Sequence, residues 1–426
     1  MLESTIRSAY EAARATYAAV GVDTEAAIAA MNAIPLSIHC WQGDDVTGLE
    51  SAGGGTSGGI MSTGNYPGKA RNGDELRADL DMALAQLPGS YKINIHASYA
   101  ELGGEKTDRD AYAPRHFSAW MDWAKAGKLG LDFNPTFFGH PMCKNDLTLS
   151  HPDKSVREFW IAHAIACRKI AAEMGRVTGQ PCVNNLWIGD GMKDMTADRG
   201  AFRANLKDSL DKIYAVDYDQ ALTRDAVECK LFGLGSESYV VGSHDFYMAY
   251  AGYARQNGKK LMLTLDMGHF HPTEQVSDKL SSILLFWDEV LLHLSRGVRW
   301  DSDHVTVFSD ELCEVARELA RANGFGRTNI ALDFFDGSIN RVAAWVIGAR
   351  AARKAILSGL LDPVTMLRDY ENAFDYSARL ALMDEARSMP VGAVWNYYCL
   401  TSGKPAGMDW LGDVKAYEAN VLNKRG

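Results

Sequence analysis

The sequence lacks several features that would place it in a specialised class of protein. No run of about 18 apolar residues occurs in its 426 residues, so no membrane-spanning helix is expected. Residues 1–21 alternate charged and small apolar side chains, unlike the continuous apolar core of a signal peptide. The seven cysteines are scattered and form no C-x-x-C pair. We therefore expect reduced thiols and a cytoplasmic protein.

Positive charge is also scarce. The chain has 44 Lys and Arg against 54 Asp and Glu, which gives a net charge of −10 and argues against a surface that binds nucleic acid. Hydrophobic residues make up 47% and charged residues 23%, a typical globular composition that can bury a large core. This composition excludes a disordered chain, a collagen and a coiled coil.

Short apolar runs alternate with longer helix-like segments along the chain, which predicts βα units and a parallel sheet. Eight such runs predict an α/β protein with a (β/α)8 TIM barrel. A doubly wound open sheet is the alternative, but no G-x-G-x-x-G follows the first run. The expected strands are Ile34–Cys40, Tyr91–Ser98, Gly130–Phe137, Cys182–Ile188, Val227–Gly233, Leu261–Asp266, Val290–Ser295 and Thr328–Phe334.

Two helical segments are expected outside the barrel, which we place at residues 31–358. Residues 1–30 are predicted to form an N-terminal helix, and residues 359–426 a helical C-terminal extension rich in aromatic residues. Such an apolar tail is expected to pack on the barrel or on a neighbouring subunit of an oligomer. One of the helices expected within the barrel spans Ser338–Ser358 and is capped by Ser338.

The connection Trp41–Gly73 is long and rich in glycine. Long loops in compact domains are usually functional, so we interpret it as a mobile active-site loop. A disordered insertion is the alternative. The loop lacks the G-x-x-x-x-G-K-[ST] motif of a phosphate-binding loop.

Carboxylates and imidazoles follow the last four expected strands, where the active site of such a barrel forms. Because the carboxylates would repel one another unless cations compensated them, we predict two divalent metal ions. Oxygen and imidazole ligands without a thiolate suit Mn²⁺, Mg²⁺, Co²⁺ or Zn²⁺. The candidate ligands are Glu237, Asp266, His269, His293, Asp301, Asp303 and Asp333.

Each of these patterns alone has a structural explanation. A D-x-D pair such as Asp301 and Asp303 is common, and a strand histidine such as His293 is more often a hydrogen-bonded core residue. The prediction rests on the co-location of several such signals at consecutive strand ends. It therefore depends on the assignment of the strands.

The first half of the barrel offers aromatic rings and hydrogen-bonding groups at its strand ends. Aromatic faces and directed polar partners suit a sugar, whose C–H faces pack on rings. Ordinary packing at the barrel mouth is the alternative. The candidate substrate-binding residues are Trp41, His96, Phe137 and Trp187.

Five stretches of the sequence resemble the L-rhamnose isomerase family of the enteric-bacterial type, and the resemblance runs nearly from end to end. They are SIHCWQGDDVTGLE (Ser37–Glu50), TGNYPGKARN (Thr63–Asn72), LDMGHFHPTE (Leu265–Glu274), RWDSDHV (Arg299–Val305) and LDFFDGSINRVAAWVIG (Leu332–Gly348). The resemblance implies a metal-dependent aldose–ketose isomerase that converts L-rhamnose to L-rhamnulose. It also implies a homotetramer of barrels and Mn²⁺ as the usual ion.

The resemblance further implies how the ligands divide. Glu237, Asp266, His293 and Asp333 would occupy a structural metal site, and His269, Asp301 and Asp303 a catalytic one. In the wider xylose-isomerase-like superfamily, a Lys often stands two residues after the Glu of the fifth strand. Counted from Glu237, that position is Tyr239, which leaves open the cation or acid that assists at the substrate carbonyl.

Two mechanisms fit these residues. A hydride shift from C2 to C1 would be promoted by the catalytic ion, while water oriented by Asp333 or a neighbouring carboxylate shuttles the hydroxyl proton. In an enediol route, a carboxylate or His96 would instead remove the C2 proton. Rival functions are a metal-dependent hydrolase or phosphodiesterase, and a non-catalytic sugar-binding protein.

Overall fold

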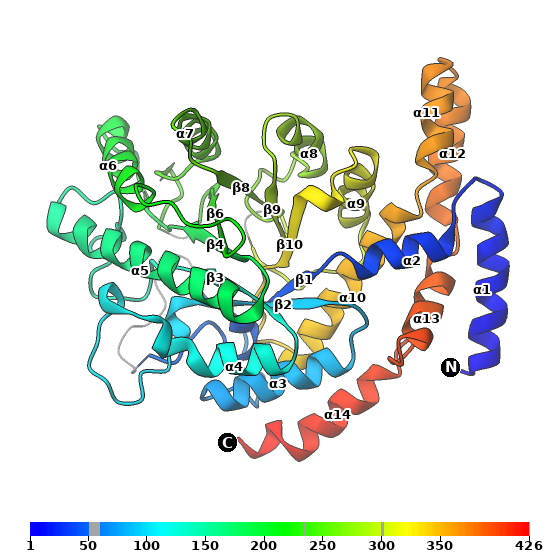
Figure 1. Ribbon diagram of the computed structural model, residues 1–426, viewed down its shortest axis with the longest axis horizontal. Coiled ribbons are helices and arrows are strands. Elements are labelled where there is room, and N and C mark those ends of the chain that lie inside the picture. Colours follow the sequence, from blue (N-terminus) through cyan, green and yellow to red (C-terminus); the bar gives the residue numbers. More distant parts are fainter. Residues whose placement is uncertain (51–59, 234, 300–301, 426) are drawn as a thin grey trace.

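The computed structural model describes residues 1–50, 60–233, 235–299 and 302–425. Parallel strands close into a barrel in the order β1-β10-β9-β8-β6-β4-β3-β2 (Figure 1). The predicted (β/α)8 barrel is therefore confirmed, and the open sheet is excluded. The barrel strands are β1 Leu36–His39, β2 Tyr91–His96, β3 Gly130–Asn134, β4 Cys182–Trp187, β6 Thr223–Glu228, β8 Leu261–Asp266, β9 Val290–Leu294 and β10 Thr328–Leu332.

The fifth barrel strand, β6, differs from the expected Val227–Gly233. It begins at Thr223 and ends at Glu228. Its charged residue Asp225 is buried because Arg168 donates to it from a neighbouring helix, with a distance of 2.8 Å between Nη2 and Oδ2. The chain then leaves the barrel and returns as β7 (Tyr239–Val240), which pairs with β5 (Gly191–Met192) in a small antiparallel sheet.

Helices surround the barrel and begin at capping side chains. The Asn72 side chain accepts from the Glu75 backbone N–H at the start of α3. At α10 the cap is Asn340 rather than the expected Ser338, whose hydroxyl donates to Asp336. The helices of this layer are α3 Gly73–Ala85, α4 Ser118–Ala126, α5 Lys154–Thr178, α6 Arg199–Ile213, α7 His244–Gln256, α8 Ser277–Leu284, α9 Asp310–Arg321 and α10 Arg341–Leu360.

Near the start of the chain, α1 lies beside the C-terminal helix α13, outside the barrel (Figure 1). Two helices, rather than one, precede it: α1 (Glu3–Ala18) and α2 (Thr24–Asn32). Tyr10 of α1 stacks on Tyr397 with ring centroids 3.6 Å apart. Four helices follow α10: α11 Val364–Asn372, α12 Tyr376–Ser388, α13 Val391–Thr401 and α14 Trp410–Asn420.

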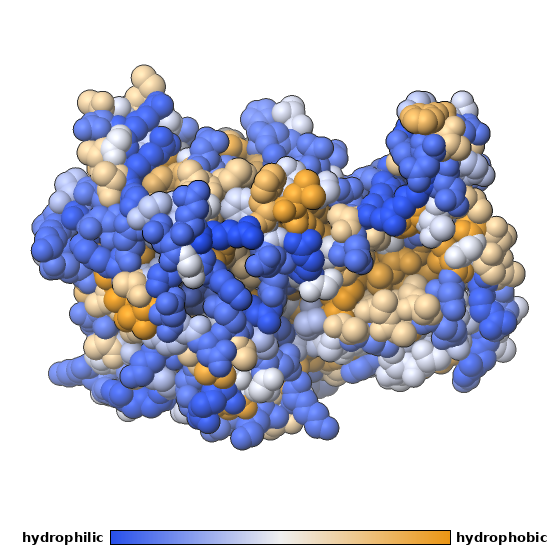
Figure 2. All heavy atoms as spheres, turned by 45° about the horizontal axis from the view of Figure 1, so that its top comes forward, coloured by the Kyte–Doolittle hydropathy of each residue, from blue (hydrophilic) through white to orange (hydrophobic). Residues whose placement is uncertain are grey.

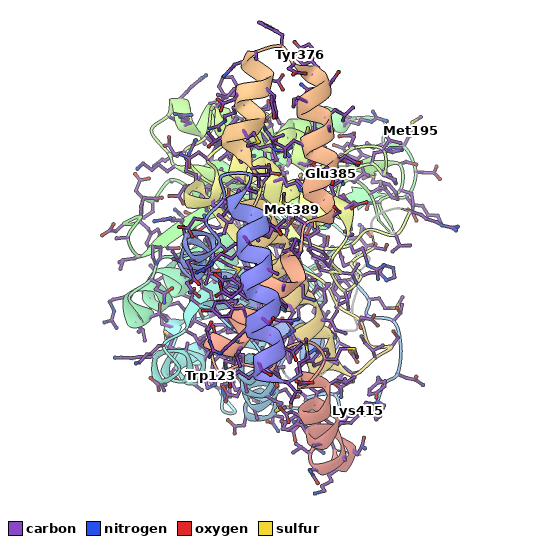
Figure 3. The ribbon with its side chains drawn as sticks, turned by 90° about the vertical axis from the view of Figure 1, so that its right-hand side faces the viewer. Trp123, Met195, Tyr376, Glu385, Met389 and Lys415 are labelled. Atoms are coloured by element: carbon purple, nitrogen blue, oxygen red, sulfur yellow. The ribbon has the colours of Figure 1, made fainter. Side chains whose placement is uncertain are left out.

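The α11–α12 hairpin projects from the body, with Tyr376 at its tip and Met389 at its base (Figure 3). No residue of α12 is buried. The side chains of Phe374, Tyr376 and Leu380 are 76%, 51% and 64% exposed. An apolar face of this size without cover within one chain is typical of a contact surface.

Alternate residues of each strand face the inside of the barrel. One interior layer is apolar and consists of Val183, Ala226, Met262, Leu291 and Ala331. Two residues further along the same strands, the side chains are polar or ionisable: Asn185, Glu228, Thr264, His293 and Asp333. The apolar layer thus forms a floor beneath a polar layer at the carboxyl ends of the strands.

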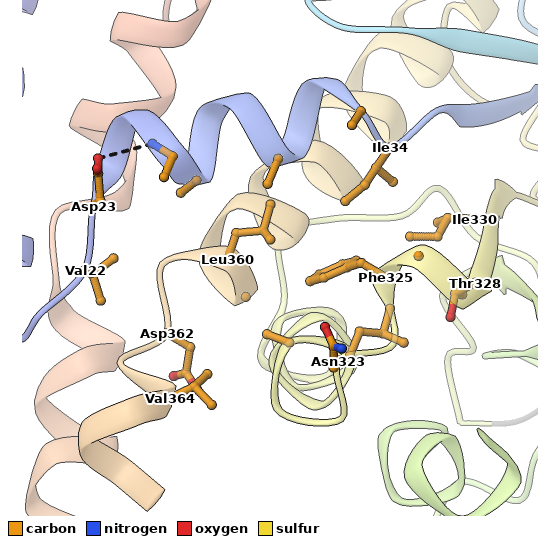
Figure 4. Close-up of a pocket in the computed structure, with 18 of the residues that line it drawn as sticks. Val22, Asp23, Ile34, Asn323, Phe325, Thr328, Ile330, Leu360, Asp362 and Val364 are labelled. Atoms are coloured by element: carbon orange, nitrogen blue, oxygen red, sulfur yellow. Dashed lines mark hydrogen bonds between the residues drawn. The ribbon is translucent and has the colours of Figure 1, made fainter. Parts of the chain in front are cut away.

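A cavity of about 770 Å³ lies at the opposite, amino-terminal end of the barrel (Figure 4). Val22, Phe325, Ile330 and Leu360 contribute apolar surface to it. Its buried carboxylates already have partners: Asp132 pairs with Lys92, and Asp362 pairs with Arg321. Because barrel chemistry takes place at the carboxyl ends of the strands, we do not assign this cavity to the active site.

None of the described helices is both long and apolar enough to cross a membrane. All seven cysteines are free thiols.

A buried carboxylate fixes the start of the connection after β1. Asp44 accepts hydrogen bonds from the Tyr99 hydroxyl (2.5 Å) and from the Gly48 backbone N–H (2.8 Å). Burial nevertheless raises the pKa of Asp44 from 3.8 to about 7.

This pKa predicts a pH-dependent stability. Because the pKa of Asp44 is higher in the folded than in the unfolded chain, its stabilising contribution is lost as pH rises from about 4 to about 7. We compare the free energy of unfolding of Asp44→Asn with that of wild type. As pH rises from 5 to 8, we expect this difference to shift by about 3 kcal/mol in favour of Asp44→Asn. Urea unfolding of both proteins at the two pH values measures this difference. A difference independent of pH would contradict the shifted pKa.

Candidate metal and sugar site

Four ionisable side chains from four strands meet in the polar layer. Glu228 and Asp266 end β6 and β8, His293 lies in β9, and Asp333 directly follows β10. The His293 Nδ1 atom lies 3.4 Å from Glu228 Oε1, 3.5 Å from Asp266 Oδ2 and 3.2 Å from Asp333 Oδ2. Three carboxylates are therefore centred on one imidazole.

Each carboxylate has one oxygen held by a protein donor, and the other faces the centre. Asn185 Nδ2 donates to Glu228 Oε2 at 2.5 Å. Ser295 Oγ (2.8 Å) and the Gly268 backbone N–H (2.6 Å) donate to Asp266 Oδ1, and Trp41 Nε1 donates to Asp333 Oδ1 at 3.1 Å. Outer contacts of this kind orient ligands before an ion binds.

The electrostatics of the cluster favour a cation at its centre. Burial would lower the pKa of His293, but the charge of Glu228 and the nearby carboxylates of Asp266 and Asp333 raise it well above its ordinary value. For the carboxyl group of Asp333, burial has the opposite effect and raises the pKa. Neither ring nitrogen of His293 has a hydrogen-bond partner with good geometry among the described residues. Three carboxylate oxygens and one imidazole nitrogen fit a divalent ion, which would supply the charge that a proton on His293 otherwise supplies.

A second group lies beside the first and shares Asp266 with it. His269 and Asp303 are its other members, and one ligand atom of each of the three lies within 4.8 Å of the others. Asp301, the remaining predicted ligand, lies outside the described residues.

Hydrogen bonds fix the orientation of the His269 ring. Its Nδ1 atom donates to the Cys229 carbonyl at 2.9 Å, which orients the imidazole toward the second group. His244 Nε2 in turn donates to the His269 carbonyl at 2.9 Å, while Cys229 Sγ lies 2.6 Å from His244 Nδ1. Cys229, His244 and His269 thus form a closed ring of hydrogen bonds.

The expectation that Glu237 follows the fifth strand is wrong. Glu237 lies nine residues beyond the last residue of β6, its side chain is exposed, and it belongs to neither group. Glu228 lies with the other three residues instead. Tyr239 is part of β7, and the residue two positions after Glu228 is Lys230. The expectation that Tyr239 stands two residues after the strand Glu is therefore wrong as well.

A cavity of about 480 Å³ opens over the two groups. Trp41, His96 and Trp187 line it, as expected for the sugar side of the site. Phe137 does not: its ring packs against Trp160 and His163, with centroids 5.4 and 5.5 Å apart. Its neighbour Phe138 lines the cavity instead.

Lys230 and His96 are two of the basic side chains that line the cavity near the ionisable groups. Lys230 is buried, and its Nζ atom lies 5.0 Å from the centroid of the Trp187 ring. His96 Nδ1 lies 3.1 Å from the Thr136 hydroxyl, and burial lowers the pKa of His96 to about 3. His96 is therefore neutral and a weak base near pH 7.

Sequence reasoning missed Glu228, Asn185 and Lys230. The signal available was the alternation of the strands: Glu228 is two residues after the interior Ala226, as His293 is two residues after Leu291. Asn185 follows the interior Val183 in the same way.

Comparisons with known proteins agree with the motifs. Residues 4–425 match the family model of L-rhamnose isomerase. The chain is 53% identical to the L-rhamnose isomerase of Rhodopirellula baltica, over 99% of this chain and 97% of that protein. It is 52% identical to that of Salmonella paratyphi A, over 100% of both. Among solved structures, an L-ribulose 3-epimerase aligns with 79% of this chain and 97% of its own, at a TM-score of 0.47 and 13% identity.

The two glutamates give a matched test of the cluster. Glu228→Gln removes one negative charge from the convergence point, so we expect the affinity for Mn²⁺ to fall by at least about tenfold. Glu237→Gln alters an exposed side chain outside both groups and should leave the affinity within about twofold. Titration of metal-free protein with Mn²⁺ by calorimetry measures both. Equal losses in the two variants would contradict the assignment of Glu228.

Proposed function

This chain belongs to the L-rhamnose isomerase family, and we propose that it interconverts the aldose L-rhamnose and the ketose L-rhamnulose with the help of two divalent ions. The observation that carries the proposal is the convergence of three anchored carboxylates on His293 beneath a cavity with aromatic walls. Mn²⁺ is our first candidate, and Zn²⁺, Co²⁺ or Mg²⁺ would suit one of the sites.

We assign different roles to the two groups. Glu228, Asp266, His293 and Asp333 would hold a structural ion. A catalytic ion would be held by His269, Asp303 and Asp301, beside the shared Asp266. When bound, such an ion polarises the C1 carbonyl and stabilises negative charge on the sugar oxygens.

The chain's own residues would orient the sugar and its protons. Lys230, held against the Trp187 ring, is our candidate for the cation that assists at the substrate carbonyl. Trp187 and Phe138 are our candidates for the walls around the C6 methyl group, Phe138 in place of Phe137. Trp41 would pack on the sugar while its indole N–H holds Asp333.

We favour a hydride shift over an enediol route. In the shift, hydrogen leaves C2 with its electron pair and bonds to C1, while the proton of the O2 hydroxyl passes to O1. The enediol route needs a base that removes the C2 proton, and an effective base has a pKa near the working pH. With its pKa lowered to about 3 by burial, His96 suits that role poorly.

We further propose that the chain forms a homotetramer and works in the cytoplasm. The unburied helix α12 supports a subunit contact, as does the apolar hollow at the foot of the projecting hairpin (Figure 2). The residues after 359 would supply much of this contact. The seven free cysteines support a reducing compartment.

The first test is the conversion of L-rhamnose by the purified protein. After EDTA treatment we expect less than about 1% of the original rate, and Mn²⁺ should restore ketose formation because the carboxylate cluster needs a compensating cation. A colorimetric ketose assay measures both states. Absence of ketose from the Mn²⁺-loaded protein would overturn the proposed substrate.

Label transfer tests the mechanism separately. With L-rhamnose deuterated at C2, a hydride shift should keep most of the label at C1 of the product, because the hydrogen never exchanges with water. An enediol route should lose most of it to solvent. Proton NMR of the rhamnulose at low conversion measures the retained fraction.

A further inference from the structure

Residues 60–68 form part of the wall of the 480 Å³ cavity, through Ile60, Met61 and Thr63. One side of this segment is attached to the turn after β10. The Tyr66 backbone N–H donates to the Gly337 carbonyl at 2.8 Å, and the Gly337 N–H donates to the Thr63 carbonyl at 3.1 Å. These two bonds join the segment to a turn that itself borders the cavity.

The other side of the segment is attached to residues 418–425, more than 350 positions away in sequence. The Tyr66 hydroxyl donates to Glu418 Oε1 at 2.7 Å, and Asn340 Nδ2 donates to Glu418 Oε2 at 3.0 Å. Arg425 Nη1 donates to the Gly68 carbonyl at 3.1 Å. Glu418 thus links the loop segment to Asn340, the residue that caps α10.

The contact at Gly68 is close enough to require glycine. Its φ is +84°, and a Cβ there would lie 2.5 Å from the Cβ of Leu422. Leu422 is buried, which shows that the two segments pack together.

The end of the chain is itself firmly held. Arg425 is buried and pairs with Asp79 of α3, with distances of 2.6 and 2.8 Å. The Tyr417 hydroxyl donates to the same carboxylate at 2.7 Å. Figure 1 shows α14 running below α3 toward this point. The segment 418–425 is therefore anchored to α3, and residues 60–68 pack against it.

We propose that the segment 418–425 positions residues 60–68 as one wall of the sugar cavity, with Glu418 and Leu422 as positioning residues for the substrate. This inference rests on the proposed function for the identity of the sugar. A purely structural role would join α14 to α3 without affecting the cavity. The two roles separate in KM, because a displaced wall weakens sugar binding while the metal ligands, which lie on other elements, stay in place.

Two pairs of full-length variants test the proposal. Glu418→Ala removes both hydrogen bonds, whereas Glu418→Gln keeps an acceptor for Tyr66. Gly68→Ala clashes with Leu422, whereas Gly104→Ala introduces a side chain at a comparable φ of +89° with nothing within 4 Å. Backbone strain is therefore matched in the second pair.

Two readouts are needed. In Glu418→Ala and Gly68→Ala, we expect amide hydrogen exchange over residues 60–68 to be about tenfold faster, with unchanged exchange in β8 and β9. We expect KM for L-rhamnose to rise about five- to tenfold, with kcat and Mn²⁺ affinity within about twofold of wild type. Glu418→Gln and Gly104→Ala should stay within about twofold of wild type in every readout.

Unchanged exchange in both test variants would overturn the claim that residues 418–425 hold the segment. Faster exchange with an unchanged KM would overturn the claim that the segment forms the wall of the sugar site. Were the wild-type protein inactive on L-rhamnose, the proposed function would be wrong, and the exchange measurement would still decide whether the segment is held.

Discussion

The mutual repulsion of three carboxylates, two of them buried and that of Asp333 half-buried, is the constraint on which the site depends. Glu228, Asp266 and Asp333 direct one oxygen each at the buried His293. Such a cluster is stable only with positive charge at its centre. The surrounding donors hold the outer oxygens, so that the cluster cannot relax by turning its carboxylates away.

The barrel meets this constraint by separating an apolar layer from a polar one. A single step of two residues along each strand leads from Val183, Ala226 and Leu291 to Asn185, Glu228 and His293. Packing of the apolar layer stabilises the fold. The polar layer is therefore free to carry the charged groups of the site. At the opposite end of the barrel, buried carboxylates of the described residues pair with basic side chains, as Asp132 does with Lys92.

The sequence was a good guide where local pattern and burial agreed. The strand Leu261–Asp266 is predicted with its observed bounds because its apolar run ends directly at Asp266, the candidate metal ligand. The strand β6 was misplaced because it contains Arg224, Asp225 and Glu228, while the apolar run follows it. Asp225 is compatible with burial only through Arg168, 57 positions away, and no local pattern contains that partner. Phe137 was misassigned for a related reason: alternation no longer applies beyond Asn134, where β3 ends.

The family resemblance supplied what periodicity could not. The motifs around Asp266, Asp303 and Asp333 indicate a common site, but they do not include the fifth strand and therefore do not distinguish Glu228 from Glu237. Three-dimensional convergence then identified Glu228 and, with it, Lys230.

Trp41 belongs to two surfaces at once. Its side chain lines the cavity and its indole N–H donates to the carboxylate of Asp333, so a molecule that displaced the ring would break a hydrogen bond to the charged cluster. Occupancy of the cavity and occupancy of the cluster are therefore thermodynamically linked through one side chain. By reciprocity, whatever factor the first occupant applies to the affinity of the second, the second applies equally to the first.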